Sequence, residues 1–313
     1  MGLRSGPAFV IEATLYTDAG CPWAYSANPS LRVLEWRYRD QLSWRLVMIG
    51  LREEPSDAMV RTYDPDRVLV RYRWFAERYG MPFSRTAKKR ASGTGPGCRA
   101  VVAAGMLQPG RDWAVLRALQ VANFTSDLYL DDPESIRAAL TTVDGIDADA
   151  VVARIDDDEV LAEYERQRAE ARSAEGTPAH AQEKTAMSDG LVRFTAPSVV
   201  FRDGERSFVA GGWQPLLAYD VVLANLDPTL ARVPLPESPD PLLDFFPHGL
   251  TTAEVALLLA DGPDPTPNGR VAEATLSALV AKGKAVRIPV GTDALWARVH
   301  ESITPPTNST VIA

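Results

Sequence analysis

The sequence predicts an α/β fold in which a sheet domain is interrupted by a long helical insertion and followed by a small C-terminal α+β module. Three observations predict it. Residues 9–49 read as strand, helix and strand, residues 64–189 carry helical patterns, and strand patterns return at residues 196–210. A helix between two strands implies a parallel βαβ unit. We therefore expect one sheet domain built from residues 8–63 and 190–228.

The first unit is predicted from its apolar and β-branched residues. Phe9 to Thr17 forms the first strand, Cys21 to about Tyr38 a helix, and Leu42 to Ile49 the second strand. Pro22 suits the first helical turn, where its missing N–H costs no hydrogen bond. The first strand therefore leads into a helix that carries a cysteine at its N-terminus.

The insertion, residues 64–189, is expected to be helical throughout. A loop rich in glycine, serine and threonine, residues 88–97, interrupts it, and Gly176-Thr177-Pro178 interrupts it again. Capping residues and apolar spacing predict helices over 66–79, 98–106, 112–128, 133–142, 148–154, from 157 towards 174, and onward to Met187.

Strand character returns at Ala196 to Phe201, and Asp203-Gly204 predicts a hairpin turn into a strand over 207–210. A helix over 214–226 follows, and the proline-rich residues 229–247 are expected to form a linker.

Residues 248–303 are predicted to form a winged-helix-like module. Its charges roughly cancel, so we expect packing or partner contact rather than DNA binding. The predicted elements are helices over 251–259 and 268–282 and strands over 284–290 and 294–299.

The amino-acid composition argues against several classes of function. The 313 residues carry a net charge of −8, which disfavours nucleic acid as a partner because phosphate binding needs a basic face. No signal peptide or membrane-spanning stretch is recognised, so we expect no membrane contact and a cytoplasmic location. Two cysteines, Cys21 and Cys98, agree with a reducing compartment. The three histidines are scattered, and we expect no metal site.

The turn before the first predicted helix contains the candidate nucleophile, Cys21. Unpaired N–H groups and the helix dipole favour a thiolate at Cys21, and cysteines so placed have pKa values lowered to roughly 3.5–7.5. We expect a nucleophile; the alternative is a cysteine packed as a small apolar side chain. Ala24, native or engineered, stands where a C-x-x-C motif has its second cysteine.

Cys-Pro-Trp at a helix start, the helical insertion and the returning Ala196-Pro197 strand resemble, in this order, the DsbA-like family of the thioredoxin superfamily. The likeness covers about residues 9–226 and is strongest to a cytoplasmic branch. That branch includes FrnE-like dithiol isomerases, 2-hydroxychromene-2-carboxylate isomerases, kappa-class glutathione transferases, mycothiol-dependent reductases and SpxH-type adaptors. The matching positions are Asp18, Cys21, Pro22, Trp23, Pro197 and residues 211–215.

The resemblance implies that the thioredoxin-like domain uses Cys21 as the attacking thiol. Pro197 would be a cis-proline that exposes the backbone of Ala196 to an extended substrate; the alternative is a trans proline opening an edge strand. Ala24 cannot resolve a mixed disulfide, so monothiol chemistry is expected. No tightly bound cofactor is implied, and glutathione or mycothiol would be the co-substrate of a disulfide or electrophile.

Other residues have two interpretations each. Trp23 and Tyr25 line a substrate groove or pack in the core, and Cys98 is a distant resolving thiol or a buried structural one. A basic set holds the carboxylates of a thiol cofactor or forms a solvated face: Lys88, Lys89, Arg90 and Arg99. The leading hypothesis is a monothiol oxidoreductase, isomerase or transferase; its rival is a non-catalytic adaptor for a protein partner. Both hypotheses are compatible with a monomer or with a homodimer.

Overall fold

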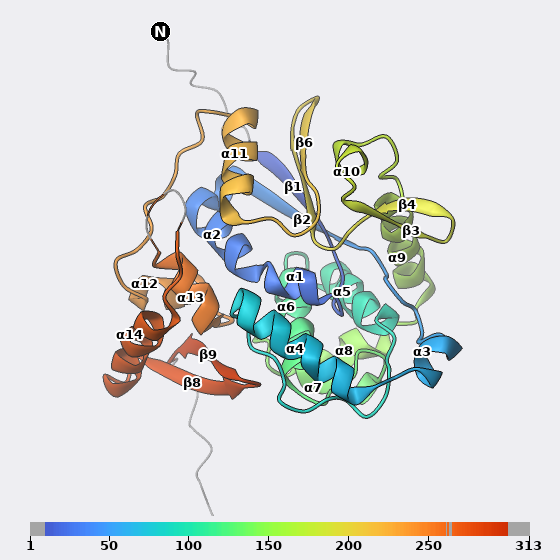
Figure 1. Ribbon diagram of the computed structural model, residues 1–313, viewed down its shortest axis with the longest axis horizontal. Coiled ribbons are helices and arrows are strands. Elements are labelled where there is room, and N and C mark those ends of the chain that lie inside the picture. Colours follow the sequence, from blue (N-terminus) through green and yellow to red (C-terminus); the bar gives the residue numbers. More distant parts are fainter. Residues whose placement is uncertain (1–9, 261, 263–264, 300–313) are drawn as a thin grey trace, which may run out of the picture.

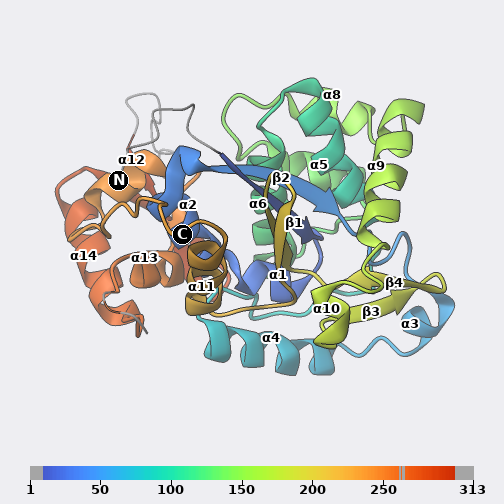
Figure 2. The same ribbon diagram turned by 90° about the horizontal axis from the view of Figure 1, so that it is seen from above.

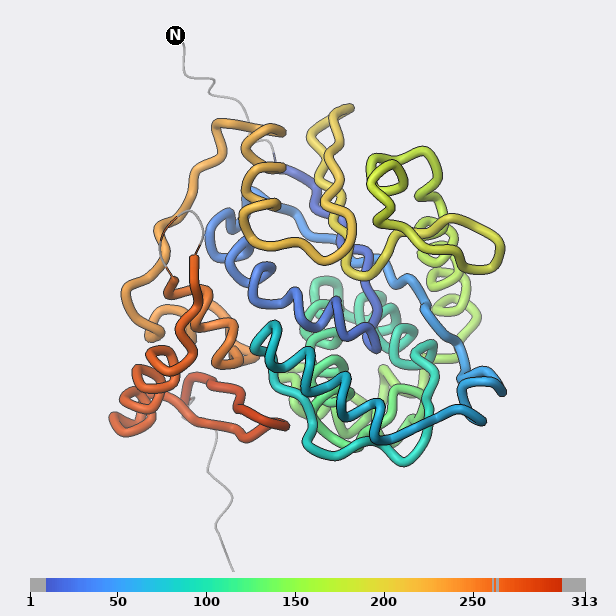
Figure 3. The backbone as a smooth tube through the Cα atoms, in the orientation of Figure 1, coloured from blue at the N-terminus to red at the C-terminus, as the bar shows by residue number. Residues whose placement is uncertain are grey.

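The computed structural model describes residues 10–260, 262 and 265–299. A four-stranded sheet of order β2-β1-β5-β6 lies at its centre (Figure 1). Strand β1 (Ile11–Thr17) pairs in parallel with β2 (Leu42–Met48) and antiparallel with β5 (Ser198–Asp203), which in turn pairs antiparallel with β6 (Arg206–Ala210). The tube in Figure 3 shows how the first strands and the returning ones, far apart in sequence, lie side by side. The predicted sheet is confirmed; Phe9, the predicted start of its first strand, and residue 8, the predicted start of the domain, lie outside the described residues.

The predicted first helix is two helices. Helix α1 (Pro22–Ser26) ends at Ala27, and α2 (Asn28–Tyr38) begins directly after it. Pro29 in the first turn of α2 has no N–H to continue the helical ladder from α1, which explains the break. Helix α11 (Leu216–Leu226) packs on β5 and β6 and contacts α2, whereas α1 contacts α4 (Pro65–Tyr79) and α6 (Asp112–Thr125) of the insertion.

The insertion is mostly helical, and side-chain caps fix several of its helix starts. Asp64, Asp132 and Asp147 each accept a hydrogen bond from a backbone N–H of the first turn. The short 3-10 turn η1 (Arg39–Gln41) joins α2 to β2. The helices after β2 are α3 (Asp57–Arg61), α4 (Pro65–Tyr79), α5 (Gly95–Leu107), α6 (Asp112–Thr125), α7 (Pro133–Leu140), α8 (Ala148–Ala153), α9 (Asp158–Ala171) and α10 (Pro178–Ala181).

The helix predicted to resume after Thr177 and run to Met187 ends at Ala181, where α10 stops, because the residues that follow form a hairpin. Strands β3 (Thr185–Ser188) and β4 (Leu191–Phe194) pair antiparallel as a separate two-stranded sheet. Asp189 and Gly190 join them, with φ of 54° and 78°. Two successive positive φ values belong to the tight turns that suit the twist of a hairpin.

The C-terminal residues form helices and a three-stranded sheet of order β7-β9-β8. Residues 229–247 are not linker throughout, since α12 (Asp240–Phe245) forms within them, and residues 300–303 lie outside the described residues. The module proper has β7 (Leu250–Thr251), α13 (Thr252–Leu258), α14 (Gly269–Ala281), β8 (Ala285–Val290) and β9 (Asp293–Arg298). Within the described part of the chain, no helix has the length and apolar character that crossing a membrane requires.

A buried ion pair joins this module to the insertion. Arg117 of α6 binds both carboxylate oxygens of Glu254 of α13, at 2.6 and 2.7 Å, and also the carbonyl of Gly249 at 2.9 Å. Burial alone would raise the pKa of Glu254, but Arg117 holds it below its usual value. The module is therefore a packed part of the molecule, seen beside α2 in Figure 2.

Candidate functional site

Cys21 stands at the junction of β1 and α1. It is the N-cap residue of α1 with extended backbone (φ −88°, ψ 115°), and Pro22 begins the helix. The Cys21 carbonyl accepts from Tyr25 N at 3.0 Å, and its N–H donates to Asp18 O at 3.2 Å. The strand end and the first helical turn therefore fix the side chain towards the β5 side of the sheet.

The thiol is buried against the returning strand. Cys21 is 5% exposed, and its Sγ donates to the carbonyl oxygen of Ala196 at 3.2 Å. The Ala196–Pro197 peptide bond is cis. Cys21 and the Ala196-Pro197 segment, which are far apart in sequence, therefore lie in contact.

The protonation state differs from the sequence-based expectation of a lowered pKa. Burial raises the pKa of Cys21 to about 12, and the Asp18 carboxylate adds to the rise. The backbone N–H groups of Ala24 and Trp23, at the helix N-terminus, act in the opposite direction but do not outweigh desolvation. In this conformation Cys21 is a neutral, hydrogen-bonded thiol.

The position of a resolving cysteine holds a buried Ala24. The second cysteine of the chain, Cys98 in α5, is fully buried. Burial, and next the neighbouring Asp18 carboxylate, raise the pKa of Cys98 well above its usual value. Both thiols are free, and Cys98 sits as a structural side chain rather than an exposed partner for exchange.

Asp18 is a buried structural anchor rather than a groove residue. Its carboxylate accepts from Gly20 N and Leu51 N, each at 2.8 Å, and from Thr94 Oγ1 at 3.2 Å. These bonds tie the loop before Cys21 to the end of β2 and to the start of α5. The same packing leaves little room at Gly20, where an added Cβ would lie 2.3 Å from the Thr94 side chain.

The two aromatic residues of the motif have different surroundings. Trp23 is 40% exposed and packs edge-on against Trp74, Phe75 and Tyr79 of α4. Tyr25 is fully buried, and its hydroxyl donates to Pro82 O at 3.0 Å. Trp23 thus belongs to an aromatic surface beside the thiol, whereas Tyr25 packs in the core.

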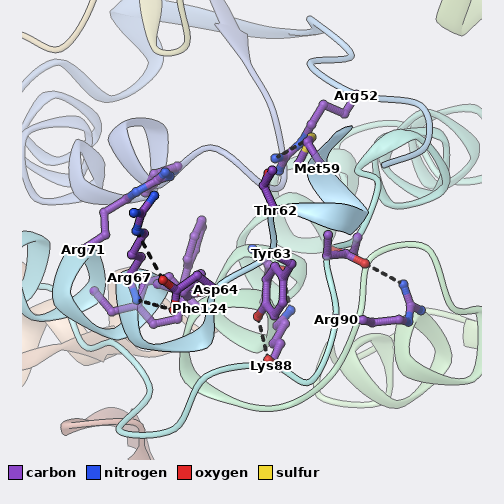
Figure 4. A pocket seen from close by; sticks show the side chains of 17 residues that line it. Arg52, Met59, Thr62, Tyr63, Asp64, Arg67, Arg71, Lys88, Arg90 and Phe124 are labelled. Carbon is purple, nitrogen blue, oxygen red and sulfur yellow. Dashed lines mark hydrogen bonds and ion pairs between the residues drawn. The ribbon is translucent and has the colours of Figure 1, made fainter. Parts of the chain in front are cut away.

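A cationic cavity of about 330 Å³ lies on the other side of the Cys21 turn, against Gly20 and Pro22. Figure 4 shows arginines and a lysine gathered around it from α4 and from the loops after β2 and before α5. The basic residues that line it are Arg52, Arg67, Arg71, Lys88 and Arg90. Asp64 is the one acidic residue among the described residues that line it.

Two of these arginines, Arg52 and Arg71, lack an anionic partner among the described residues. Arg52 has a buried Nε without a hydrogen bond, and its Nη1 reaches only the Met59 sulfur at 3.9 Å. No hydrogen bond or ion pair joins Arg71 to any described residue. The cavity therefore offers positive charge that the protein itself does not neutralise.

The basic residues predicted from sequence divide into two pairs. Lys88 and Arg90 line the cavity, whereas Lys89 and Arg99 do not. Lys88 is buried, donating to Asn123 Oδ1 at 2.6 Å and to Leu128 O, and burial lowers its pKa to about 8. Arg99 is neutralised by Glu53 at 2.7 Å and Asp156 at 3.0 Å.

Sequence reasoning missed the residues that cover the thiol and the two unpartnered arginines. Cys21 lies in an apolar cluster with Ala171, Ala174, Ala179 and Phe194, which come from α9, the segment after it, α10 and the unpredicted β4. Arg52 and Arg71 lie far from the glycine-rich loop in sequence, so the composition of the loop alone could not point to them. The Asp189-Gly190 dipeptide was a readable hairpin signal.

Comparison with known proteins agrees with this geometry. The family model of the DSBA-like thioredoxin domain matches residues 13–196. Among curated proteins, none matches the sequence significantly.

The chain is similar in structure to several solved proteins. A "putative protein disulfide isomerase" from Nitrosomonas europaea superposes with a TM-score of 0.53 at 16% identity, covering 69% of this chain and 97% of its own. The cytosolic disulfide reductase DsbM from Pseudomonas aeruginosa gives 0.48 at 19% identity, over 70% and 98%. A 2-hydroxychromene-2-carboxylate isomerase gives 0.43 at 16% identity, over 69% and 95%. At 16% identity the first likeness shows the fold alone.

Proposed function

The chain belongs to the DsbA-like thioredoxin family, and from this premise we propose that it exchanges thiols and disulfides through Cys21 alone, with an external low-molecular-weight thiol. The observation that carries the proposal is the 3.2 Å contact between Cys21 Sγ and Ala196 O beside Pro197. It places the one thiol of the motif against the backbone that would pair with an extended substrate.

The proposed reaction has two balanced steps. The Cys21 thiol gives up its proton, its sulfur attacks one sulfur of a disulfide, and the other sulfur leaves as a thiolate that takes up a proton. A second thiol then attacks the mixed disulfide, releases Cys21 and forms a new disulfide. The sum converts one disulfide and one thiol into another disulfide and another thiol, with no further oxidant.

Ala24 makes the external thiol necessary. With a cysteine at this place, the mixed disulfide would be resolved within the chain. We therefore expect that Ala24→Cys makes release of a trapped substrate independent of added thiol. Measuring release from a fluorescent mixed disulfide with and without glutathione tests this; equal dependence on glutathione in both proteins would contradict it.

The cationic cavity supports a co-substrate that carries carboxylates. Glutathione has two carboxylates, whereas mycothiol has a sugar and an inositol in their place, so unpartnered Arg52 and Arg71 favour a glutathione-like thiol. The cavity touches Gly20 and Pro22, the neighbours of Cys21 on either side of it. A reducing cytoplasm, where such thiols are abundant, is the location that we propose.

The test is exchange with hydroxyethyl disulfide and glutathione. We expect Cys21→Ser to abolish turnover and Cys98→Ser, a matched change at the other buried thiol, to leave it largely intact. Turnover retained by Cys21→Ser would overturn the proposal. Turnover lost in both variants, with both still folded, would also contradict a monothiol mechanism at Cys21.

A second candidate is a non-catalytic adaptor that binds a protein partner. The observation in its favour is the neutral, buried state of Cys21, together with a groove of about 960 Å³ between α4, α11 and the C-terminal module. Tyr79, Trp213 and Leu257 are among its lining residues. An adaptor would keep its partner in Cys21→Ser and would show no exchange in the wild type.

A further inference from the structure

A short segment of the chain covers the Cys21 thiol. Residues 175–194, here called the cap, comprise α10 and the β3–β4 hairpin (Figure 1). Ala179 and Phe194 of the cap lie in the apolar cluster that contains Cys21, and the Phe194 ring stacks on Tyr16 at 4.3 Å. The cap therefore contributes directly to the burial of the thiol.

The cap has little core of its own. Across residues 175–193, all of which the structure describes, Ala179 is the one buried residue. Its backbone is joined to its surroundings by few bonds, such as Ala174 N to Val192 O at 3.1 Å. Segments with few buried apolar contacts open at low free-energy cost.

One carboxylate fastens the turn of the hairpin to the body of the domain. Asp189 Oδ2 accepts from Arg172 at Nε (3.0 Å) and Nη2 (2.9 Å), and from Arg168 Nη2 at 3.5 Å. Arg172 is itself anchored, because its buried guanidinium donates to Ile49 O at 2.9 Å. Asp189 is 63% exposed, so this attachment can be broken without disturbing the core.

We propose that the cap is a latched cover over Cys21, held closed by Asp189 on Arg172 and Arg168, and that its release admits a disulfide to the thiol. Cys21 is 5% exposed, and a thiol on a residue so buried offers no line of approach to an attacking or leaving sulfur. Opening of the cap supplies that approach. The use of this step in exchange rests on the proposed function, but the existence of the cover does not.

The test is the rate at which iodoacetamide alkylates Cys21 in the full chain, read by mass spectrometry. Asp189→Asn removes the charge and keeps a residue that tolerates positive φ. We expect it to accelerate alkylation of Cys21 about three- to tenfold, in keeping with the loss of a partly exposed charged contact. Cys98, fully buried in α5, serves as the internal reporter of global unfolding and is expected to keep its rate.

The matched control is Asp203→Asn, at the turn of the β5–β6 hairpin, where Asp203 pairs with Arg206. An unchanged Cys21 rate in Asp189→Asn would overturn the proposal, as would an equal rise at Cys98 or in the control. Exchange of hydroxyethyl disulfide is measured in parallel. A Cys21 rate that depends on Asp189 without any exchange would support the cap and refute the proposed function.

Discussion

Two parts of the molecule cover the thioredoxin-like domain, and they are fastened in opposite ways. The C-terminal module is joined through Glu254, which is 0% exposed and bound bidentately by Arg117. The cap over Cys21 is joined at its turn through Asp189, which is 63% exposed. The comparison indicates that the module is a permanent part of the fold, whereas the cap can separate from it.

The largest expected effect is at the fastening of the module. Glu254→Gln leaves the buried guanidinium of Arg117 without its counter-charge, which typically lowers the free energy of unfolding by about 3–5 kcal/mol. Urea denaturation measures it. Asp244→Asn, which breaks an exposed pair with Arg298, is the control and should cost no more than about 1 kcal/mol. If both variants cost the same, the module is not fastened by this pair.

Amide hydrogen exchange measures directly how much more readily the cap opens than the C-terminal module does. We expect the amides of β3 and β4 to exchange about 100-fold faster, or more, than those of β8 and β9, because local opening of the cap exposes little apolar surface. Exchange read at peptide resolution in the wild-type chain suffices. Equal protection of the two hairpins would remove the distinction between a permanent and a separable cover.

The free energy of unfolding, measured over a range of pH, tests whether Glu254 fastens the module as a carboxylate. The pKa of Glu254 is lowered in the folded state, so its contribution is present above the unfolded value of about 4.3 and is lost as pH falls through the folded value. We expect the stability gap between wild type and Glu254→Gln to narrow as pH falls from 6 to 3. A gap that stays constant, or that widens on acidification, would show that Glu254 is not held as a carboxylate.

Much of the fold could be predicted because its signals are local. The apolar strand before Cys21, Pro22 at the helix start and the Asp203-Gly204 turn each act over a few residues, and the structure has a strand, a helix and a hairpin there. Asp189-Gly190 carried an equally local signal, but the helical pattern before it was extended too far. The break between α1 and α2 likewise follows from Pro29.

The state of the thiol could not be predicted in the same way. A helix N-terminus argues for a low pKa from neighbours within one turn. Burial raises the pKa of Cys21 instead, and it comes from Ala179, Phe194 and Ala196, more than 150 residues along the chain. The order of the motifs brings Pro197 to the thiol, but nothing in the sequence states how tightly the space between them is filled.

The smallest expected effect is on the KM for glutathione, and it concerns an arginine of the cavity beside the Cys21 turn. Arg298 of the module is neutralised by Asp240 and Asp244, whereas Arg71 beside the Cys21 turn has no ion-pair partner among the described residues. We expect Arg71→Gln to raise the KM for glutathione about three- to fivefold, the size of one exposed charged contact, with kcat nearly unchanged.

Arg73→Gln is the matched control for this change, since Arg73 is also exposed on α4 but lines a different cavity. Added salt should reduce the difference between Arg71→Gln and wild type, because screening weakens exposed charge contacts. If Arg73→Gln raises the KM equally, the net charge of α4 attracts the thiol and the cavity does not bind it. If only Arg71→Gln does so, the cavity beside the Cys21 turn binds the thiol through an arginine that no described residue neutralises.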